Sequence, residues 1–339
     1  MKKTLIFLLI SMLLLSFCAC DGFNYDILDS DSSDSGNGSD APTINGNVSD
    51  VSVRVPSGSF KAVVLGDSIA RGYGLESPES MRFSALLEKS LAMVYEDIAI
   101  ANYGVDGRTG EELIDFVKNE PPKELADCDC IIISIGGNNI LQMLDTLDTA
   151  LNALMEIDPK AVADYFKYTV TDEGEEKDKL AYACDVLSSV FGAINVAFES
   201  ETFNSLITDA GKRLENEIPR LISELRKINP DAKIYFQTVY NPYKDINLSL
   251  QDVEEKLDLD THGERAVAKL NAPIEALAEE NGYEIVPVWQ EFDRSNKTLT
   301  NAGISLITAS ISFDPHPNAR GHELIAEIYY GIISEAKND

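Results

Sequence analysis

The sequence predicts an α/β fold, a three-layer α/β/α sandwich whose central layer is a five-stranded parallel sheet. From Lys61 onward, short β-rich runs alternate with helical segments, which is typical of a parallel sheet covered by helices on both faces. The run Cys130–Ile135 is apolar along nearly its whole length, as expected for a central strand buried on both faces. Right-handed crossovers between the strands then complete the sandwich.

Five runs are predicted to be strands, because each is short and rich in apolar and β-branched residues. They are, in chain order, Ala62–Leu65, Ile98–Tyr103, Cys130–Ile135, Lys233–Val239 and Tyr283–Val288. The helices predicted around them are Ser77–Val94, Thr109–Asn119, Thr261–Asn281 and Asn318–Ala336. The first of these places Ser77 at the N-cap and Pro78 at the first helical position, where both residue types are preferred.

Residues 140–226 show only helical patterns, far more than one crossover needs, and predict a helical insertion. Its segments are Leu141–Met155, Lys160–Tyr168, Asp178–Phe198 and Thr208–Lys227. Two interpretations are open. The insertion is a subdomain that adds core, or it is a cap that shapes an acyl or leaving-group pocket. Its position directly after a candidate site residue favours the cap.

Residues 1–20 are typical of a bacterial lipoprotein signal peptide. Two lysines precede an apolar run, Leu5–Phe17, which is shorter than the about 20 residues of a transmembrane helix. Ala19 and Cys20 follow, which resembles the lipobox, where a small residue precedes the cysteine that receives the lipid. We expect lipid attachment at Cys20 and an extracytoplasmic protein anchored to the bacterial cell membrane. An ordinary secreted protein with a nearby cleavage site is the alternative.

Residues 21–59 are rich in Asp, Ser, Gly and Asn and hold few side chains that could bury apolar area. This composition predicts a disordered acidic tether, because too little burial is available to offset the entropy of ordering. The folded domain is therefore expected over residues 60–339, with the tether holding it away from the membrane surface.

The charge and the cysteines exclude several classes of partner. Lysine and arginine total 28 and aspartate and glutamate total 57, which gives a net charge of −29. Such a surface repels phosphate groups, so we expect no nucleic-acid partner and membrane contact only through the lipid. We also expect the protein to be a monomer. Cys128, Cys130 and Cys184 cannot all pair with one another, and we interpret them as free thiols. No zinc-binding spacing is present, and neither a metal nor another cofactor is predicted.

Four short polar stretches follow predicted strand ends or precede the last predicted helix. Gly66-Asp67-Ser68 follows the first strand, residues 102–107 follow the second and residues 136–139 follow the third. Residues 313–318, Phe-Asp-Pro-His-Pro-Asn, precede the last helix. Ligands of such sheets bind beyond the carboxyl ends of the strands. The four stretches therefore mark one candidate site.

In this order, the four stretches resemble the SGNH/GDSL hydrolase family, which is named after a Ser, a Gly, an Asn and a His in successive blocks. Here these match Ser68, Gly104, Asn138 and His316. The resemblance runs from about Lys61 to the C-terminus, apart from the helical insertion. It implies the flavodoxin-like fold of that family and hydrolysis of esters without a cofactor.

The resemblance also implies a role for each of these residues. Ser68 would attack the ester carbonyl and His316 would take its proton, since a free hydroxyl is a poor nucleophile. The oxyanion hole would consist of the backbone N–H groups of Ser68 and Gly104 and the side-chain amide of Asn138. Glycine at position 104 lets the backbone approach the substrate closely.

The group that orients His316 is left open. The family commonly has Asp three residues before the histidine, but Phe313 stands there, and Asp314 lies two residues before it. We expect Asp314 to orient the imidazole, because serine hydrolases use an acid for this purpose. A backbone carbonyl is the alternative and would leave a Ser–His dyad. Asn139, where the family often has Asp, is a second departure.

The remaining histidines are expected to have structural roles. His322 lies in the last predicted helix, where it would cap or pack. His262 follows Thr261 at the start of a predicted helix, and we expect it to be exposed.

The sequence thus predicts an extracytoplasmic serine esterase that works through an acyl-enzyme on Ser68. A carbohydrate or small acyl ester is the expected substrate, as a small molecule or a polysaccharide, and a lysophospholipase or lipase activity is the alternative. A non-catalytic surface-binding lipoprotein is disfavoured, because both Ser68 and His316 are present. A solute-binding lipoprotein would need two α/β lobes, whereas the predicted strands suffice for one.

Overall fold

The structure, a computed structural model, describes residues 56–138, 175–305, 310–312 and 314–336. All of these belong to one compact unit of the chain, Arg54–Asp339. The expected leader with Cys20, the tether up to residue 55 and the helices expected at 141–155 and 160–168 lie outside the described residues. Asn139 and Phe313 also lie outside them.

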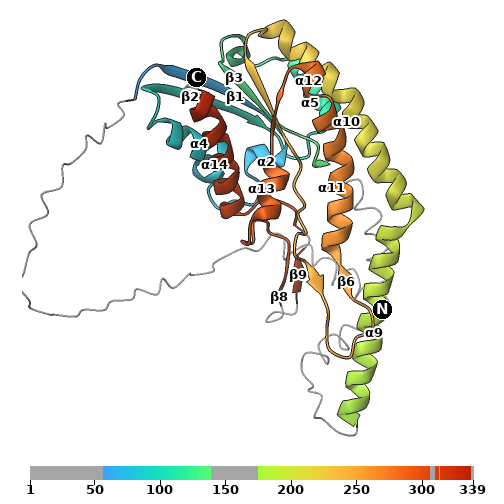
Figure 1. The fold of residues 1–339 in the computed structure, drawn as a ribbon. Helices are drawn as coiled ribbons and strands as arrows, with labels where there is room; N and C mark the ends of the chain where they lie inside the picture. Colours follow the sequence, from blue (N-terminus) through green and yellow to red (C-terminus); the bar gives the residue numbers. More distant parts are fainter. Residues whose placement is uncertain (1–55, 139–174, 306–309, 313, 337–339) are drawn as a thin grey trace, which may run out of the picture. The chain divides into compact units, whose positions relative to one another are not determined.

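Five parallel strands form the central sheet in the order β2-β1-β3-β4-β7, which confirms the predicted fold class (Figure 1). Their bounds are β1 Ser59–Gly66, β2 Asp97–Gly104, β3 Cys130–Ser134, β4 Lys233–Gln237 and β7 Glu284–Val286. Gly66 at the end of β1 is level with Gly104 of β2 on one side and with Ser134 of β3 on the other. The loops that follow these three strands therefore meet at one edge of the sheet.

Two short antiparallel pairs accompany the sheet, and the sequence patterns do not predict them. They are β5 Asn247–Leu248 with β6 Leu257–Asp258, and β8 Gly303–Ser305 with β9 Ser310–Ser312. Strands of two or three residues are too short to show an alternation of apolar and polar side chains.

Helices connect the strands, and two predicted helices are divided. The longer helices are α4 Phe83–Leu91, α5 Gly110–Asn119, α9 Glu175–Glu199, α10 Glu201–Ile228, α11 Leu259–Ala276 and α14 Ala319–Ala336. The shorter ones are α2 Ser68–Arg71, α3 Pro78–Met81, a 3₁₀ turn Lys123–Ala126, α12 Ala278–Asn281 and α13 Val288–Arg294. The helix predicted over 77–94 is broken at Arg82, whose backbone is extended. The helix predicted over 261–281 is likewise divided, into α11 and α12.

The core has one layer on each face of the sheet. Helices α5, α10 and α11 cover one face, with Leu113, Leu214 and Leu270 among their buried side chains. Helices α4, α13 and α14 cover the other face, where Phe83 and Tyr329 pack. Figure 1 shows these two groups of helices on opposite sides of the strands. The arrangement is the three-layer sandwich expected from the alternation of strands and helices.

A third apolar cluster joins α9 to the beginnings of α10 and α11. Phe191 and Ile194 of α9, Phe203 of α10 and Leu259 of α11 are buried in it. Within the described residues, the stretch Lys179–Glu199 is long and apolar enough to cross a membrane, but core helices of soluble proteins share this property. Here the stretch contributes a face to a protein core. The described part of the predicted insertion is thus a pair of long helices that packs on α11.

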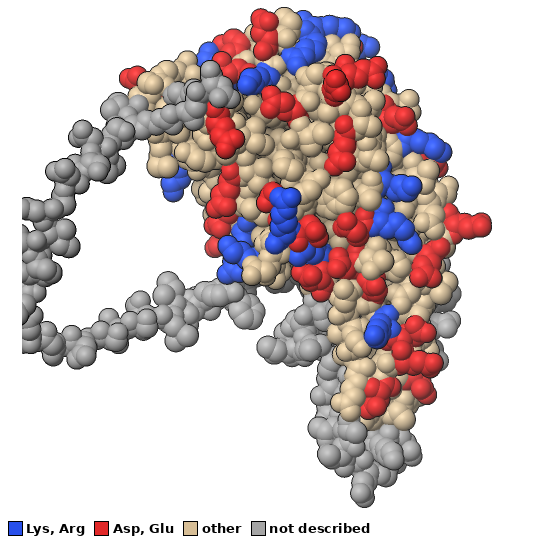
Figure 2. Space-filling model, viewed as in Figure 1, with Lys and Arg blue, Asp and Glu red and all other residues tan. Residues whose placement is uncertain are grey.

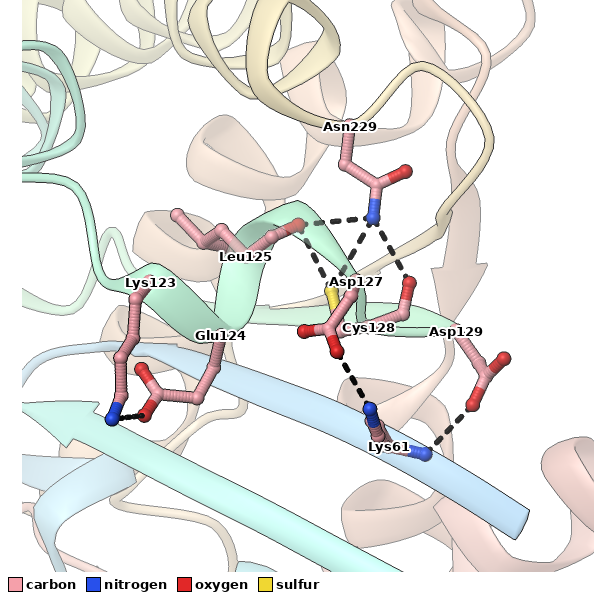
Figure 3. Close-up of polar contacts among 8 residues, drawn as sticks. All are labelled: Lys61, Lys123, Glu124, Leu125, Asp127, Cys128, Asp129 and Asn229. Carbon is pink, nitrogen blue, oxygen red and sulfur yellow. Dashed lines mark hydrogen bonds and ion pairs between the residues drawn. The ribbon is translucent and has the colours of Figure 1, made fainter.

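A polar clasp holds the opposite edge of the sheet, where the strands begin. It consists of Lys61, Asp127, Cys128, Asp129 and Asn229 (Figure 3). The Lys61 N–H donates to Asp129 Oδ2 at 2.7 Å, and the buried Asn229 side chain donates to the Cys128 carbonyl at 3.0 Å. The Lys61 ammonium also pairs with Asp127, but both side chains are largely exposed, so this ion pair adds little stability. The clasp joins the start of β1 to the turn before β3 and to the end of α10.

Acidic and basic side chains are interspersed over the face of the protein that Figure 2 shows. Cys128, Cys130 and Cys184 are all free and buried, as interpreted from the sequence. Burial raises the pKa of the Cys128 thiol to about 11, so this thiol is uncharged at neutral pH.

Candidate active site

Ser68 stands at the carboxyl edge of the sheet, between β1 and β3. Strand β1 ends at Gly66, and Asp67 then caps the short helix α2, whose first residue is Ser68. Asp67 Oδ1 accepts the Ile69 N–H at 2.9 Å, while the Asp67 N–H donates to the Ser134 carbonyl at 3.2 Å. The side chain that precedes Ser68 is thereby fixed to the first turn of α2, and the main chain is fixed to β3.

His316 reaches Ser68 from the loop that precedes α14. Its Nε2 lies 2.9 Å from Ser68 Oγ, and its Nδ1 lies 2.6 Å from Asp314 Oδ1. His316 lies 248 positions after Ser68 in the chain, and Asp314 lies two positions before His316. The structure therefore brings together Ser68, His316 and Asp314 in one hydrogen-bonded line.

Asp314 is held on both of its carboxylate oxygens. Oδ1 also accepts the backbone N–H of His316 at 3.1 Å, and Oδ2 accepts from the Asn301 amide at 3.2 Å. Burial favours a higher pKa for Asp314, but the hydrogen bonds from His316 and Asn301 outweigh it, and the pKa lies below its ordinary value. The carboxylate is therefore charged at neutral pH and faces the imidazole N–H.

Tyr73 covers the imidazole and was not singled out by the sequence. Its ring lies 4.5 Å from the His316 ring between centroids, at an interplanar angle of 41°. It follows the turn after α2, and 45% of the residue is exposed. No motif predicts this contact, since it depends on how the loop before α14 folds back over α2.

The two remaining residues of the predicted site are placed differently. Asn138 lines the same pocket as Ser68, and its Nδ2 donates to the Arg108 carbonyl at 2.9 Å. The Gly104 N–H instead donates to Asn102 Oδ1 at 2.9 Å. A Cβ at position 104 would lie 2.4 Å from the Arg71 nitrogen. The structure thus gives Gly104 a packing role, in which its missing side chain lets α2 lie against β2.

Gly107, which is not among the site residues predicted from the sequence, is the neighbouring glycine on the Asn138 side. Its φ is +74°, a conformation that glycine adopts without strain. Its peptide group precedes Arg108, whose carbonyl contacts Asn138. The described part of the chain offers no hydrogen-bond acceptor to the Gly107 N–H. A second glycine, three residues after Gly104, was the signal available in the sequence.

Asp67 is a buried carboxyl group directly before the serine. Burial raises the pKa of Asp67 to about 7, although the Ile69 N–H and the nearby His316 act in the opposite direction. Only 1% of the residue is exposed. The group therefore titrates near neutral pH at the floor of the site.

The other two histidines are both buried, so the expectation that His262 is exposed is wrong. His322 packs against Phe83 and accepts its N–H on Nδ1 at 3.2 Å, in line with the expected structural role. His262 is 5% exposed, and its ring stacks on Phe198 at 5.0 Å between centroids. Phe198 lies far from position 262 in the chain, so a local pattern around Thr261 could not reveal this contact.

One pocket of about 820 Å³, its open mouth included, runs from Ser68 and His316 to the helices of the insertion. Asp67, Gly137 and Asn138 line it beside the serine, and its other walls come from the loop after β4 and from α9, α10 and α11.

An acid, an imidazole and a serine hydroxyl in a hydrogen-bonded line, at the carboxyl edge of a parallel sheet, define the class of hydrolases that use a serine. The chain belongs to the GDSL-like lipase/acylhydrolase family, whose model matches residues 64–324. It is therefore a hydrolase that acts on ester bonds, as the resemblance in the sequence implied.

The chain is also similar to individual proteins. It is 21% identical over 274 residues to the uncharacterized protein YpmR of Bacillus subtilis, which covers 80% of each chain. Among solved structures, an extracellular lipase from Streptomyces rimosus has a TM-score of 0.49 at 15% identity, covering 82% of this chain and 99% of that one. The lipase Lip_vut3 from a goat rumen metagenome has a TM-score of 0.48 at 16% identity, covering 80% and 96%.

Proposed function

We propose that the protein hydrolyses carboxylic esters through an acyl-enzyme on Ser68. The observation that carries this proposal is the distance of 2.9 Å between Ser68 Oγ and His316 Nε2, with Asp314 behind the imidazole. His316 takes the hydroxyl proton as Ser68 attacks the ester carbonyl, and Asp314 stabilises the imidazolium that forms. The alcohol leaves with that proton. Water then attacks the acyl-enzyme with the same assistance and releases the acid.

Donors for the oxyanion lie on the Asn138 side of Ser68. An amide nitrogen carries two N–H donors, and the Arg108 carbonyl takes one of those of Asn138. The second, together with the backbone N–H of Ser68, would stabilise the oxyanion of the tetrahedral intermediate. We assign the third donor to the Gly107 N–H, in place of the Gly104 N–H that the sequence suggested, because the latter is bonded to Asn102.

Two variants of the full chain test this mechanism on p-nitrophenyl butyrate. Ser68→Ala is expected to lower kcat/KM by more than about 10³-fold, because the nucleophile is lost. Asn138→Ala is expected to lower kcat by about 10²- to 10³-fold, which is the usual effect of losing one oxyanion donor. Ser205→Ala, on an exposed serine of α10, is the matched control and should retain wild-type activity. Undiminished hydrolysis by Ser68→Ala would refute the acyl-enzyme on Ser68, whereas absence of hydrolysis in the wild type would favour the non-catalytic binding protein.

We also propose that the protein is extracytoplasmic and anchored by a lipid on Cys20, with an acidic tether before the domain. The basic residues at 2–3, the apolar run Leu5–Phe17 and the Ala19-Cys20 pair support this proposal. The full chain expressed in a bacterium should fractionate with membranes, and Cys20→Ala should release it or leave it unprocessed. Equal membrane association of both proteins, with equal cleavage of the leader, would exclude lipid attachment at Cys20. No nucleic-acid partner is proposed, and the protein is expected to act as a monomer.

A further inference from the structure

The pocket beside Ser68 has a polar end and an apolar end. Ser68, Asn138 and His316 stand at the polar end. Beyond them the walls are formed by Ile69, Val239 and Pro242 and by Ala266 and Val267 of α11. These side chains offer a ligand neither a donor nor an acceptor.

The lining also includes an aromatic corner that consists of Phe198, Phe203 and His262. The rings of Phe198 and Phe203 lie 4.9 Å apart at 81°, and the His262 ring stacks on Phe198 at 12°. Arg265 fixes the corner from behind, because its guanidinium donates to the Phe198 carbonyl and lies 5.8 Å over the Phe203 ring. Burial, together with the charge of Arg265, lowers the pKa of His262, so the ring facing the pocket is uncharged at neutral pH.

Every residue of this corner belongs to the helical insertion or to α11, on which the insertion packs. Phe198 ends α9, Phe203 begins α10, and His262 lies in the first turn of α11. The described part of the insertion therefore extends the wall of the site, which was one of the two interpretations open in the sequence.

We propose that this pocket binds the acyl chain of the substrate, and that the substrate is an ester of a medium-chain fatty acid. The proposal rests on the proposed acyl-enzyme on Ser68. The carbonyl carbon lies at Ser68, and the hydrocarbon chain extends between α11 and the loop after β4 towards the aromatic corner. The leaving alcohol then lies on the other side of Ser68, away from the apolar walls.

An apolar chain fits these walls better than a sugar or an acetyl group. A sugar in the same pocket would leave its hydroxyl groups without partners along the apolar walls, which costs binding energy. The Tyr240 hydroxyl, one of the polar atoms on this side, already donates to the Pro315 carbonyl at 2.8 Å. An acetyl group would leave the apolar end empty. Each methylene that enters it should raise kcat/KM by up to about fourfold.

The experiment is a chain-length series with the full-length wild-type protein. The p-nitrophenyl esters of acetic, butyric, hexanoic, octanoic and dodecanoic acid are compared with acetylated xylose. We expect kcat/KM to rise by more than tenfold from acetate to octanoate and to remain lowest for the acetylated sugar. A series that is flat or highest at acetate, or a preference for the sugar ester, would overturn the acyl pocket.

Substitutions at two alanines of α11 test where the acyl chain of the substrate lies in the pocket. Ala266 is buried in the pocket wall, whereas Ala268, two residues further along the same helix, is exposed. Ala266→Leu should lower the ratio of octanoate to acetate kcat/KM at least about fivefold, because it fills the path to the corner. Ala268→Leu should leave that ratio at the wild-type value. An unchanged ratio in Ala266→Leu would place the acyl chain elsewhere and overturn the proposal.

The two proposals fail in different ways. Activity that survives Ser68→Ala would refute the proposal of an acyl-enzyme on Ser68. Activity that depends on Ser68 but shows no chain-length preference would refute only the proposal of an acyl pocket. If Ala266→Leu fails to fold, the wild-type series decides alone, since it needs no substitution.

Discussion

Asp314 Oδ1 lies 2.6 Å from His316 Nδ1, although only Pro315 separates the two residues in the chain. The same oxygen accepts the backbone N–H of His316 at 3.1 Å. The loop thus turns the acid back onto both the main chain and the ring of the residue two positions later. The spacing of two, which departs from the family pattern, still places a carboxylate behind the base.

Asp314→Asn should lower kcat/KM by about 10³- to 10⁴-fold, with little change in KM. An asparagine amide that donates to Nδ1 would hold the imidazole in the wrong tautomer, with its N–H directed at Ser68. Steady-state kinetics on p-nitrophenyl butyrate measures this effect. Asp293→Asn, on an exposed residue of α13, is the control. A loss of less than tenfold in Asp314→Asn would support the Ser–His dyad in which a backbone carbonyl orients the base.

Gly104→Ala should destabilise the fold by about 1–3 kcal/mol, because its Cβ would lie 2.4 Å from the Arg71 nitrogen and would push α2 off β2. Thermal unfolding followed by circular dichroism measures the loss. Gly331→Ala in α14 has open space around its new Cβ and should be neutral or slightly stabilising. If Gly104→Ala unfolds like the wild type but loses activity, the glycine serves the oxyanion hole after all.

Asp67→Asn should change how stability depends on pH. The pKa of Asp67 is about 7 in the folded protein, above its ordinary value of 3.8, so the native state binds the proton more tightly than the unfolded chain. This group therefore stabilises the fold at low pH and loses that contribution as pH rises from about 4 to about 7. Between pH 5 and pH 8 the free energy of unfolding of the wild type should fall by about 2–3 kcal/mol more than that of the variant.

Urea denaturation at pH 5 and at pH 8 measures that difference. Asparagine also caps helices, so the cap of α2 is retained in the variant. The variant should therefore be the more stable protein at pH 8, and the two proteins should differ less at pH 5. Parallel pH dependences of the two would show that Asp67 does not titrate in this range.

Tyr73→Leu should lower kcat/KM about two- to fivefold, because the tyrosine ring lies 4.5 Å from the His316 ring and would stabilise the imidazolium formed in each step. Tyr73→Phe retains the aromatic face and should keep most of the activity. Equal losses in the two variants would instead assign the effect to the tyrosine hydroxyl.

The sheet could be predicted from the sequence because its strands are short apolar runs with clear boundaries. The run Cys130–Ile135 became β3, which is buried throughout. The break at Arg82 could not be predicted, since neither Gly nor Pro marks it and the extended backbone there is set by packing. For the same reason, α10 begins at Glu201, one to two turns before the helix predicted from Thr208.

The site could be predicted in part. Ser68 and His316 stand in motifs at element ends, and the topology brings such ends to one edge of the sheet. The bond from the Gly104 N–H to the Asn102 side chain depends on a rotamer, and no spacing of residues reveals it. The burial of His262 depends on the ring of Phe198, which comes from another helix. Side-chain rotamers and contacts between distant segments therefore limited the prediction more than the choice of secondary structure did.

The polar clasp and Ser68 lie at opposite ends of the same strand, β1. From Lys61 to Ser68 the chain advances about 20 Å, which is more than two screening lengths of about 8 Å in physiological salt. Charge changes at the exposed Lys61 and Asp127 are therefore largely screened from the catalytic groups. An enzyme coupled to a solid support through this end would present its active site to the solution, which makes the exposed clasp residues a natural point for immobilisation.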